Sequence, residues 1–229
     1  MERTLHKKNI PFFIIGLAAG ILVSLTVIRM LNVTITHDEA LTYQWYVSHS
    51  YGDIILNHIP TANNHFLNSV LAKISLKAFT DNVFFLRLPN LLALIAYLAL
   101  SVLIARKLFG NRWWVLFCFL LLQLNPFMFE FWGLARGYGL ALSFMLAAFY
   151  ALLLCLQRPA FLTFSAIYFF LFLAVFSNMA LLNAVMAFSA IIGIYWLQHI
   201  KQPGAVRWLA GAIVYTGLIV LSIYEQIRI

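Results

Sequence analysis

The chain has 229 residues, of which 64% are hydrophobic and 10% are charged, and its mean hydropathy is +0.92. Soluble domains carry about 25% charged residues, so this composition excludes a soluble globular protein. The net charge of +8 could suggest nucleic acid as a partner. However, most Lys and Arg residues fall in short gaps that alternation assigns to one side of a membrane, as expected of cytoplasmic loops. We therefore exclude a nucleic-acid partner and expect contact with membrane lipids.

Seven apolar runs predict an all-α, polytopic membrane helical bundle that forms a single module over residues 1–229. About 20 apolar residues are needed to cross the hydrocarbon core. The first run is longer than the apolar core of a signal peptide, which predicts an uncleaved anchor. The third run should be kinked or unwound at Asn125-Pro126. The expected spans are 10–30, 88–105, 113–131, 137–157, 161–177, 179–197 and 207–224.

The basic gaps also orient the chain in a cell (inner) membrane. With the N-terminus in the cytoplasm, the gaps at 106–112, 158–160 and 198–206 are cytoplasmic, and residues 31–87 are external or periplasmic. In the first span, Gly16-x-x-x-Gly20 fits a motif for close helix packing. Such matches arise by chance often enough that this one carries no weight.

Segment 31–87 is too polar to span the membrane, yet it shows helical patterns. A short helix is expected around Glu39–His49, with Thr36 or Asp38 as its N-cap. A second helix has apolar residues at helical spacing, with lysines on another face, and should lie along the membrane surface. Its apolar positions are Leu67, Val70, Leu71, Ile74 and Phe79, and its lysines are Lys73 and Lys77. We therefore predict a structured external loop built from juxtamembrane helices.

Asp38 and Glu39 are the first candidates for chemistry, because they are adjacent carboxylates directly after the first span. Asp38 could act as a general base toward an acceptor hydroxyl or amine. Glu39 would then orient Asp38 or hold the acceptor. The alternative is structural, because acidic residues also favour the first turn of a surface helix.

Two further groups of polar residues lie at predicted membrane boundaries. Asn64 and His65 precede the amphipathic helix and could bind a sugar or a phosphate; alternatively, they form a capping turn with His65 facing water. Irregular spacing of the loop histidines disfavours a metal site. Arg136 could bind a lipid phosphate; alternatively, it pairs with Glu130 or only anchors its helix. Arg87, taken alone, reads as part of an ordinary helix start.

The order of these motifs resembles the polyprenyl-phosphate-sugar-dependent type C glycosyltransferases, the broad group that contains protein O-mannosyltransferases and aminoarabinose transferases. The motifs that carry the resemblance are His37-Asp38-Glu39-Ala40, Asn64-His65-Phe66-Leu67, Arg87-Leu88-Pro89 and Ala135-Arg136-Gly137-Tyr138. They cover residues 30–145. No single motif is specific, and it is the ordered set that indicates the family.

The resemblance implies a multi-pass membrane enzyme that transfers a sugar from a polyprenyl-phosphate donor to an acceptor at the external face. Asp38 and Glu39 would be catalytic, and Asn64, His65, Arg87, Arg136 and Tyr138 would bind the substrate. No cofactor is required; a divalent metal is compatible with the family but is not indicated here. Family members are about twice as long, so a partner subunit could supply the C-terminal module. The alternatives are a non-catalytic subunit or truncated paralogue that binds lipid-linked sugar and, third, a small transporter or flippase.

Overall fold

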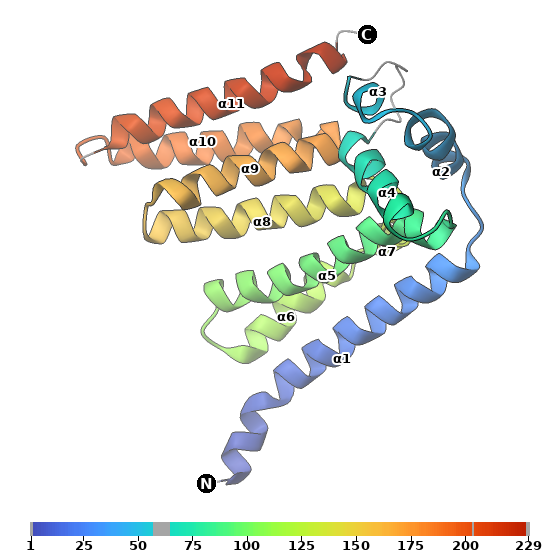
Figure 1. The fold of residues 1–229 in the computed structure, drawn as a ribbon. Helices are drawn as coiled ribbons and strands as arrows, with labels where there is room; N and C mark the ends of the chain where they lie inside the picture. The colour runs from blue at the N-terminus through green and yellow to red at the C-terminus, as the bar shows by residue number, and fades with distance from the viewer. Residues whose placement is uncertain (1, 57–64, 203, 228–229) are drawn as a thin grey trace.

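The computed structural model describes residues 2–56, 65–202 and 204–227, and every regular element in these ranges is a helix (Figure 1). For these residues the predicted all-α class is confirmed. The elements, in chain order, are α1 (Glu2–Asn32), α2 (His37–Thr42), the π-helix η1 (Tyr43–Val47), α3 (Tyr51–Ile55), α4 (Phe66–Ala78), α5 (Val83–Leu108), α6 (Arg112–Gln123), α7 (Pro126–Trp132), α8 (Tyr138–Gln157), α9 (Phe161–Ser177), the 3-10 helix η2 (Met179–Leu181), α10 (Leu182–Gln198) and α11 (Ala205–Ile227).

Five helical segments are long and apolar enough to cross a bilayer, which gives the chain the character of a multi-pass membrane protein. A helix rises 1.5 Å per residue, so 20 to 26 residues extend over about 30 to 39 Å and match the hydrocarbon core. The five segments are Asn9–Asn32, Val83–Leu108, Tyr138–Gln157, Met179–Gln198 and Ala205–Tyr224.

The prediction of seven spans is only partly confirmed, because the expected span 113–131 consists of two short helices. α6 ends at Gln123 and α7 begins at Pro126. Pro126 has no N–H to donate and disfavours a helical conformation at Asn125, whose side-chain oxygen instead accepts from the Met128 N–H. With 12 residues, α6 is about 18 Å long and cannot cross alone. α9, with 17 residues, is also shorter than the five.

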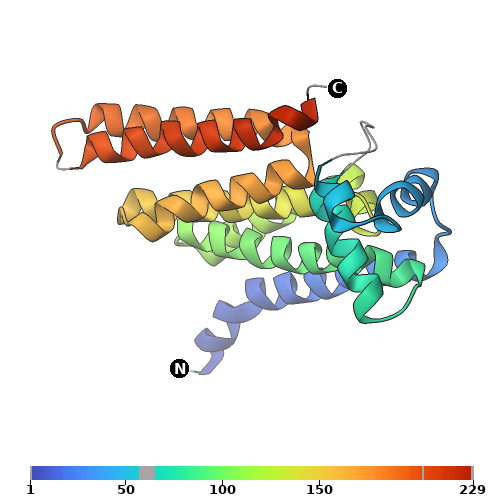
Figure 2. The ribbon, with the colours of Figure 1, turned by 45° about the horizontal axis from the view of Figure 1, so that its top comes forward.

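Figures 1 and 2 show the long helices side by side, with the short helices gathered at one end of the bundle. α8 and α9 form an antiparallel pair at the centre. α10 and α11 lie along one side of this pair, and α5, α6 and α1 lie along the other. The short helices α2, η1, α3 and α4, here called the platform, lie across the end where α5 and α8 begin. The predicted loop 31–87 is thus largely helical where it is described.

α4 packs the polar side of its sequence against the protein, in contrast to the predicted orientation. Asn68 is fully buried and Lys73 is 8% exposed, whereas Ile74 is 48% exposed. The Lys73 ammonium donates to the carbonyl oxygens of Val47, at 2.7 Å, and of His49. Periodicity placed Lys73 on a different face from the apolar residues, but it does not reveal that the carbonyl groups at and after the end of η1 bind this ammonium group.

Side-chain hydrogen bonds join α9, α10 and α11 within the apolar bundle. Ser189 on α10 lies 2.7 Å from the Thr216 hydroxyl on α11 and 3.4 Å from the Tyr168 hydroxyl on α9. Lipid tails are as apolar as the helix surfaces, so helix association in a bilayer depends on packing and on such polar contacts. Ser189 is therefore a polar contact shared by all three of the C-terminal helices.

Replacing Ser189 by Ala should destabilise the bundle by about 1 kcal/mol, because it removes hydrogen bonds between helices. Ser222→Ala is the matched control, since the Ser222 hydroxyl donates only to Ile219 O within its own helix. Reversible unfolding in mixed micelles measures both variants. An equal loss of stability in the two would contradict this role for Ser189.

Candidate functional site

The two adjacent carboxylates Asp38 and Glu39 lie in the first turn of α2, which Thr36 caps. The Thr36 hydroxyl accepts from the Glu39 N–H at 3.4 Å, and the Glu39 carboxylate accepts from the Thr36 N–H at 3.0 Å. This reciprocal pattern is a capping box, which satisfies two free amides of the helix start. Of the two predicted N-caps, Thr36 is therefore confirmed. The cap fixes the positions from which the two carboxylates extend.

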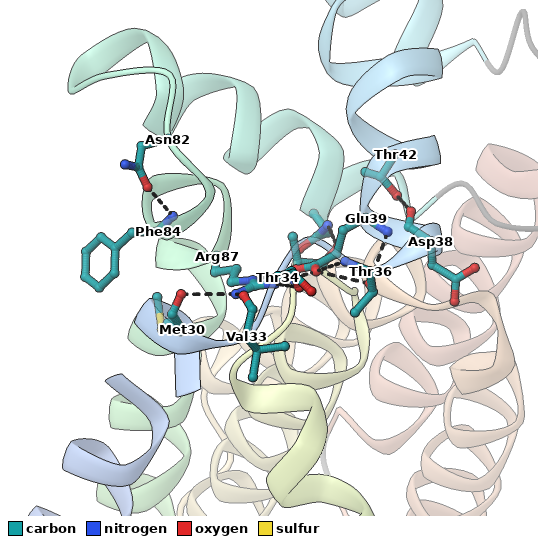
Figure 3. A network of polar contacts seen from close by, with 12 residues as sticks. Met30, Val33, Thr34, Thr36, Asp38, Glu39, Thr42, Asn82, Phe84 and Arg87 are labelled. Carbon is teal, nitrogen blue, oxygen red and sulfur yellow. Dashed lines mark hydrogen bonds and ion pairs between the residues drawn. The ribbon is translucent and has the colours of Figure 1, made fainter. Parts of the chain in front are cut away.

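Glu39 forms a fully buried ion pair with Arg87 of α5 (Figure 3). The Arg87 Nε and Nη2 atoms donate to the two carboxylate oxygens at 2.8 and 2.7 Å, and both side chains are 0% exposed. The remaining donors of Arg87 bind the carbonyl oxygens of Met30, Val33 and Thr34. All five N–H groups of the guanidinium are thus in use.

Glu39 also contacts the segment that precedes α8. Its Oε1 atom accepts from the Ala135 N–H at 2.7 Å. Burial by itself raises the pKa of Glu39, but the hydrogen bonds from Arg87, Ala135 and Thr36 outweigh it and hold the pKa below its usual value. The carboxylate is therefore ionised at neutral pH.

The resemblance implied that Glu39 is catalytic and that Arg87 binds the substrate, but the contacts of both side chains indicate a structural role. Arg87 has no free donor for a substrate, and Glu39 has no exposed oxygen for an acceptor. Together they join the end of α1, the start of α2, α5 and the segment before α8. We call this set of contacts the Glu39–Arg87 clamp, and we assign it a positioning role.

Asp38 differs from its neighbour because it is half exposed. Its side chain is 49% exposed and points away from the clamp in Figure 3. It forms an ion pair with Nη1 of Arg136, whose side chain is 13% exposed. The predicted alternative pair between Arg136 and Glu130 does not form. The structure thus joins the candidate base and the candidate phosphate ligand, 98 positions apart in the sequence.

Arg136, the partner of Asp38, lies beside Tyr138, which in turn contacts His65. The Arg136 guanidinium lies 5.5 Å from the centroid of the Tyr138 ring, and the His65 ring meets the same Tyr138 edge-on at 5.2 Å. Nε of Arg136 and Nε2 of His65 are buried atoms without a hydrogen-bond partner among the described residues. Buried polar atoms are rarely left unpaired. These two nitrogen atoms are therefore candidate contacts for a bound ligand.

His65 is held in one tautomer. Its Nδ1 lies 3.0 Å from the Ser177 carbonyl oxygen, which can only accept, so Nδ1 carries the hydrogen. Burial lowers the pKa of His65, and the Ser177 contact offsets this only in part. The ring is therefore neutral at pH 7, and Nε2 presents a lone pair. The alternative of a water-facing His65 is wrong, because the residue is 8% exposed.

Two glycines allow the helices to approach at this point. A Cβ on Gly137 would lie 1.8 Å from Ser177 O, and a Cβ on Gly139 would lie 2.8 Å from the Trp132 ring. No side chain fits in either place. The Arg136-Gly137-Tyr138 segment is therefore pressed against the end of α9, which places Arg136 and Tyr138 beside His65.

Sequence reasoning missed two buried asparagines that fix the same segment. Asn68 donates to Ala135 O at 2.9 Å, and Asn90 donates to the Asn68 side-chain oxygen at 2.8 Å. Asn90 lies within an apolar helix, and a polar residue in a membrane span is a recognisable signal. The predicted ligand Asn64 lies outside the described residues. Among the described residues, no three His, Cys, Asp or Glu side chains cluster as a metal site would require.

Comparison with family models finds no match for this chain, and comparisons with curated proteins and with solved structures find none either.

Removing the Glu39 charge should destabilise the protein by about 3 kcal/mol, because it leaves the buried Arg87 unpaired. Thermal or chemical unfolding of Glu39→Gln in detergent measures this. Glu130→Gln is the matched control, since Glu130 is exposed and lies in α7 at the same end of the bundle. A Glu39→Gln variant as stable as Glu130→Gln would contradict the clamp.

The same ion pair predicts an acid dependence of stability. Because the folded-state pKa of Glu39 is lowered, its stabilising contribution is present above the unfolded value of about 4.3 and is lost as the pH falls through the folded-state pKa. The wild-type free energy of unfolding should therefore fall more steeply in this acid range than that of Glu39→Gln. Parallel slopes for the two proteins would rule this out.

Proposed function

We propose that this protein is an integral-membrane glycosyltransferase that transfers a sugar from a polyprenyl-phosphate donor to an acceptor at the platform end of the bundle. The observation that carries the proposal is the half-exposed Asp38 carboxylate beside the Arg136 guanidinium. The Glu39–Arg87 clamp holds the helix that carries Asp38, and the close packing at Gly137 and Gly139 holds the segment that carries Arg136. The order of the motifs in the sequence supports the same assignment.

In the proposed reaction, Asp38 accepts the proton of an acceptor hydroxyl or amine. The acceptor atom forms a bond to the anomeric carbon, and the bond between that carbon and the phosphate oxygen breaks. The electron pair leaves with the polyprenyl phosphate. The Arg136 guanidinium would stabilise the negative charge that develops on this leaving group. Electrostatic stabilisation contributes most where charge develops in the transition state. Nε of Arg136, which is buried and has no partner among the described residues, would supply a second donor for bidentate contact.

The ion pair with Asp38 occupies the position that the phosphate would take. A partly exposed ion pair contributes little stability, whereas a phosphate can engage the guanidinium fork through two bonds. The donor would therefore displace Asp38 from Arg136. Freed of its cationic partner, Asp38 becomes a better proton acceptor. The base would thus be released only when the donor is in place.

His65 would contribute to recognition of the sugar. Its lone pair at Nε2 fits a hydroxyl donor, and its lowered pKa argues against a cationic phosphate ligand. Tyr138, which contacts both His65 and Arg136, would form the wall between the sugar and the phosphate. Asn64, adjacent in the sequence, remains a predicted contact.

The proposed orientation places the platform at the external face of a cell (inner) membrane. The last turn of α5, with Arg106 and Lys107, and the connections that contain Arg158 and Lys201 lie at the end of the bundle opposite the platform (Figure 1). Basic connections favour the cytoplasmic side. The donor would then reach the site laterally from the outer leaflet.

Asp38→Asn tests the function with two readouts. Transfer of radiolabelled sugar from the lipid donor to membrane extract, measured in nanodiscs, should be lost. Affinity for undecaprenyl phosphate should rise about two- to fivefold, since the competing carboxylate is gone and an exposed pair is worth up to about 1 kcal/mol. Glu130→Gln controls for the loss of one negative charge and should leave transfer intact.

Full transfer activity of the Asp38→Asn variant would contradict the assignment of Asp38 as the general base. Weaker phosphate binding by this variant would contradict displacement of Asp38 by the donor. Binding of the lipid by the wild type without transfer would favour the second candidate, a non-catalytic subunit that binds lipid-linked sugar.

Two substitutions of His65, by Gln and by Asn, test whether its Nε2 atom accepts a hydrogen bond from the sugar. Gln places an amide oxygen near the position of Nε2 and can accept from the sugar, whereas Asn reproduces only the Nδ1 donor to Ser177. We expect His65→Asn to raise the KM for the donor about tenfold, the value of one hydrogen bond to a neutral group. His65→Gln should retain more of the wild-type affinity. The reverse order would contradict an acceptor at Nε2.

A further inference from the structure

Thr26 of α1 is a buried polar residue that the proposed reaction does not use. Its side chain is 0% exposed, and its hydroxyl has no hydrogen-bond partner among the described residues. A threonine within a helix can donate to the carbonyl oxygen four residues earlier, which here is that of Leu22, but within the described structure Thr26 makes no such bond. Because buried polar groups are nearly always paired, this hydroxyl points to a partner that is not part of the chain.

A small cavity lies against Thr26, between α1, α5 and the break that separates α6 from α7. It has room for about 10 Å³, and one water molecule needs about 10 to 15 Å³ on the same measure. Thr26 and Tyr97, which both line it, belong to helices long enough to cross the bilayer. Leu122 and Gln123 at the end of α6 and Trp132 of α7 line it as well. The cavity therefore lies inside the bundle and has the size of one water molecule.

The helix break gives this cavity polar groups. In a continuous helix the Leu122 carbonyl would accept from the N–H of residue 126, but that residue is Pro126, which has none. The Leu122 carbonyl accepts from the Tyr97 hydroxyl at 3.2 Å, which is long for an O–H···O bond. A carbonyl oxygen and a phenol hydroxyl can each take part in a further hydrogen bond. The residues around the cavity thus offer hydrogen-bonding groups from α1, α5 and α6.

We propose that one water molecule occupies this cavity and bridges the Thr26 hydroxyl to the Tyr97 hydroxyl and the Leu122 carbonyl. Buried waters typically make about three hydrogen bonds to groups that are otherwise unsatisfied. A broken helix is tolerated at membrane depth where side chains and ordered waters satisfy the freed backbone groups. No carboxylate lines the cavity among the described residues, which disfavours a cation, because a charge inside the bilayer is costly without a partner. The water would join α1 to the α6–α7 break, and this role is independent of the proposed reaction.

Thr26→Val keeps the shape of the side chain and removes its hydroxyl, so the sign of its effect tests the water. If water pairs with the hydroxyl, the midpoint of thermal unfolding of the full chain in detergent should fall by about 2 to 4 °C, the value of one hydrogen bond in a protein of this size. If the hydroxyl has no partner, its removal relieves a buried unpaired group, and the midpoint should stay the same or rise. An equal or higher midpoint for Thr26→Val therefore overturns the proposal.

A double-mutant cycle distinguishes a shared water from a bond that Thr26 makes alone. Thr26→Val and Tyr97→Phe each remove one partner of the same water, so the double variant should lose at least about 2 °C less than the sum of the two single losses. Thr26→Val combined with Ser222→Ala is the control cycle and should be additive, since the Ser222 hydroxyl donates within α11. Additive losses in the first cycle would contradict a bridge between Thr26 and Tyr97.

A crystal structure detects the water directly. At a resolution that orders water molecules, the wild type should show one peak of density within about 3 Å of Thr26 Oγ1. A missing peak, or a Thr26 hydroxyl that donates to the Leu22 carbonyl, would rule the water out. The unfolding midpoint should also be the same in sodium chloride and in choline chloride. A higher midpoint in sodium chloride alone would identify a bound cation and overturn the assignment to water.

Discussion

The buried ion pair between Glu39 and Arg87 is the contact on which the platform end of this protein depends. Both side chains are 0% exposed, and burying two charges is costly unless every donor and acceptor is satisfied. Here the requirement is met by carbonyl groups at the end of α1, by the cap of α2 and by the Ala135 N–H. Satisfying one arginine therefore brings four segments of the chain into a fixed arrangement.

This arrangement explains how two adjacent carboxylates take different parts. Glu39 points into the protein, where its charge is neutralised and no oxygen is exposed. Asp38 points outward and pairs with Arg136, whose Nε has no partner within the described part of the chain. A catalytic group works best when its neighbours hold it rigidly, and Glu39 would provide that rigidity for Asp38, the proposed base. The Glu39–Arg87 pair is thus buried and fixed, whereas the neighbouring Asp38–Arg136 pair is partly exposed.

The proposed reaction site lies where helices from both halves of the chain meet. Gly137 and Gly139 admit no side chain, and Asn68 and Asn90 fix the Ala135 carbonyl. These contacts hold Arg136 between the platform and α9. In lipid, apolar burial does not drive helices together. Helix association there depends on close packing at small residues and on buried hydrogen bonds.

The sequence alone determined the membrane character, the helical class and the break at Asn125-Pro126, and it narrowed the cap of α2 to Thr36 or Asp38, because hydropathy, proline and capping patterns act over a few residues. It also selected Asp38, His65 and Arg136 as charged or polar residues at membrane boundaries. Only the tertiary structure decided their partners: Arg87 with Glu39, Arg136 with Asp38, and His65 with Ser177. It also turned Lys73 inward and shortened one expected span. Such pairings join residues from 48 to 112 positions apart, and no local pattern encodes which distant donor a buried acceptor meets.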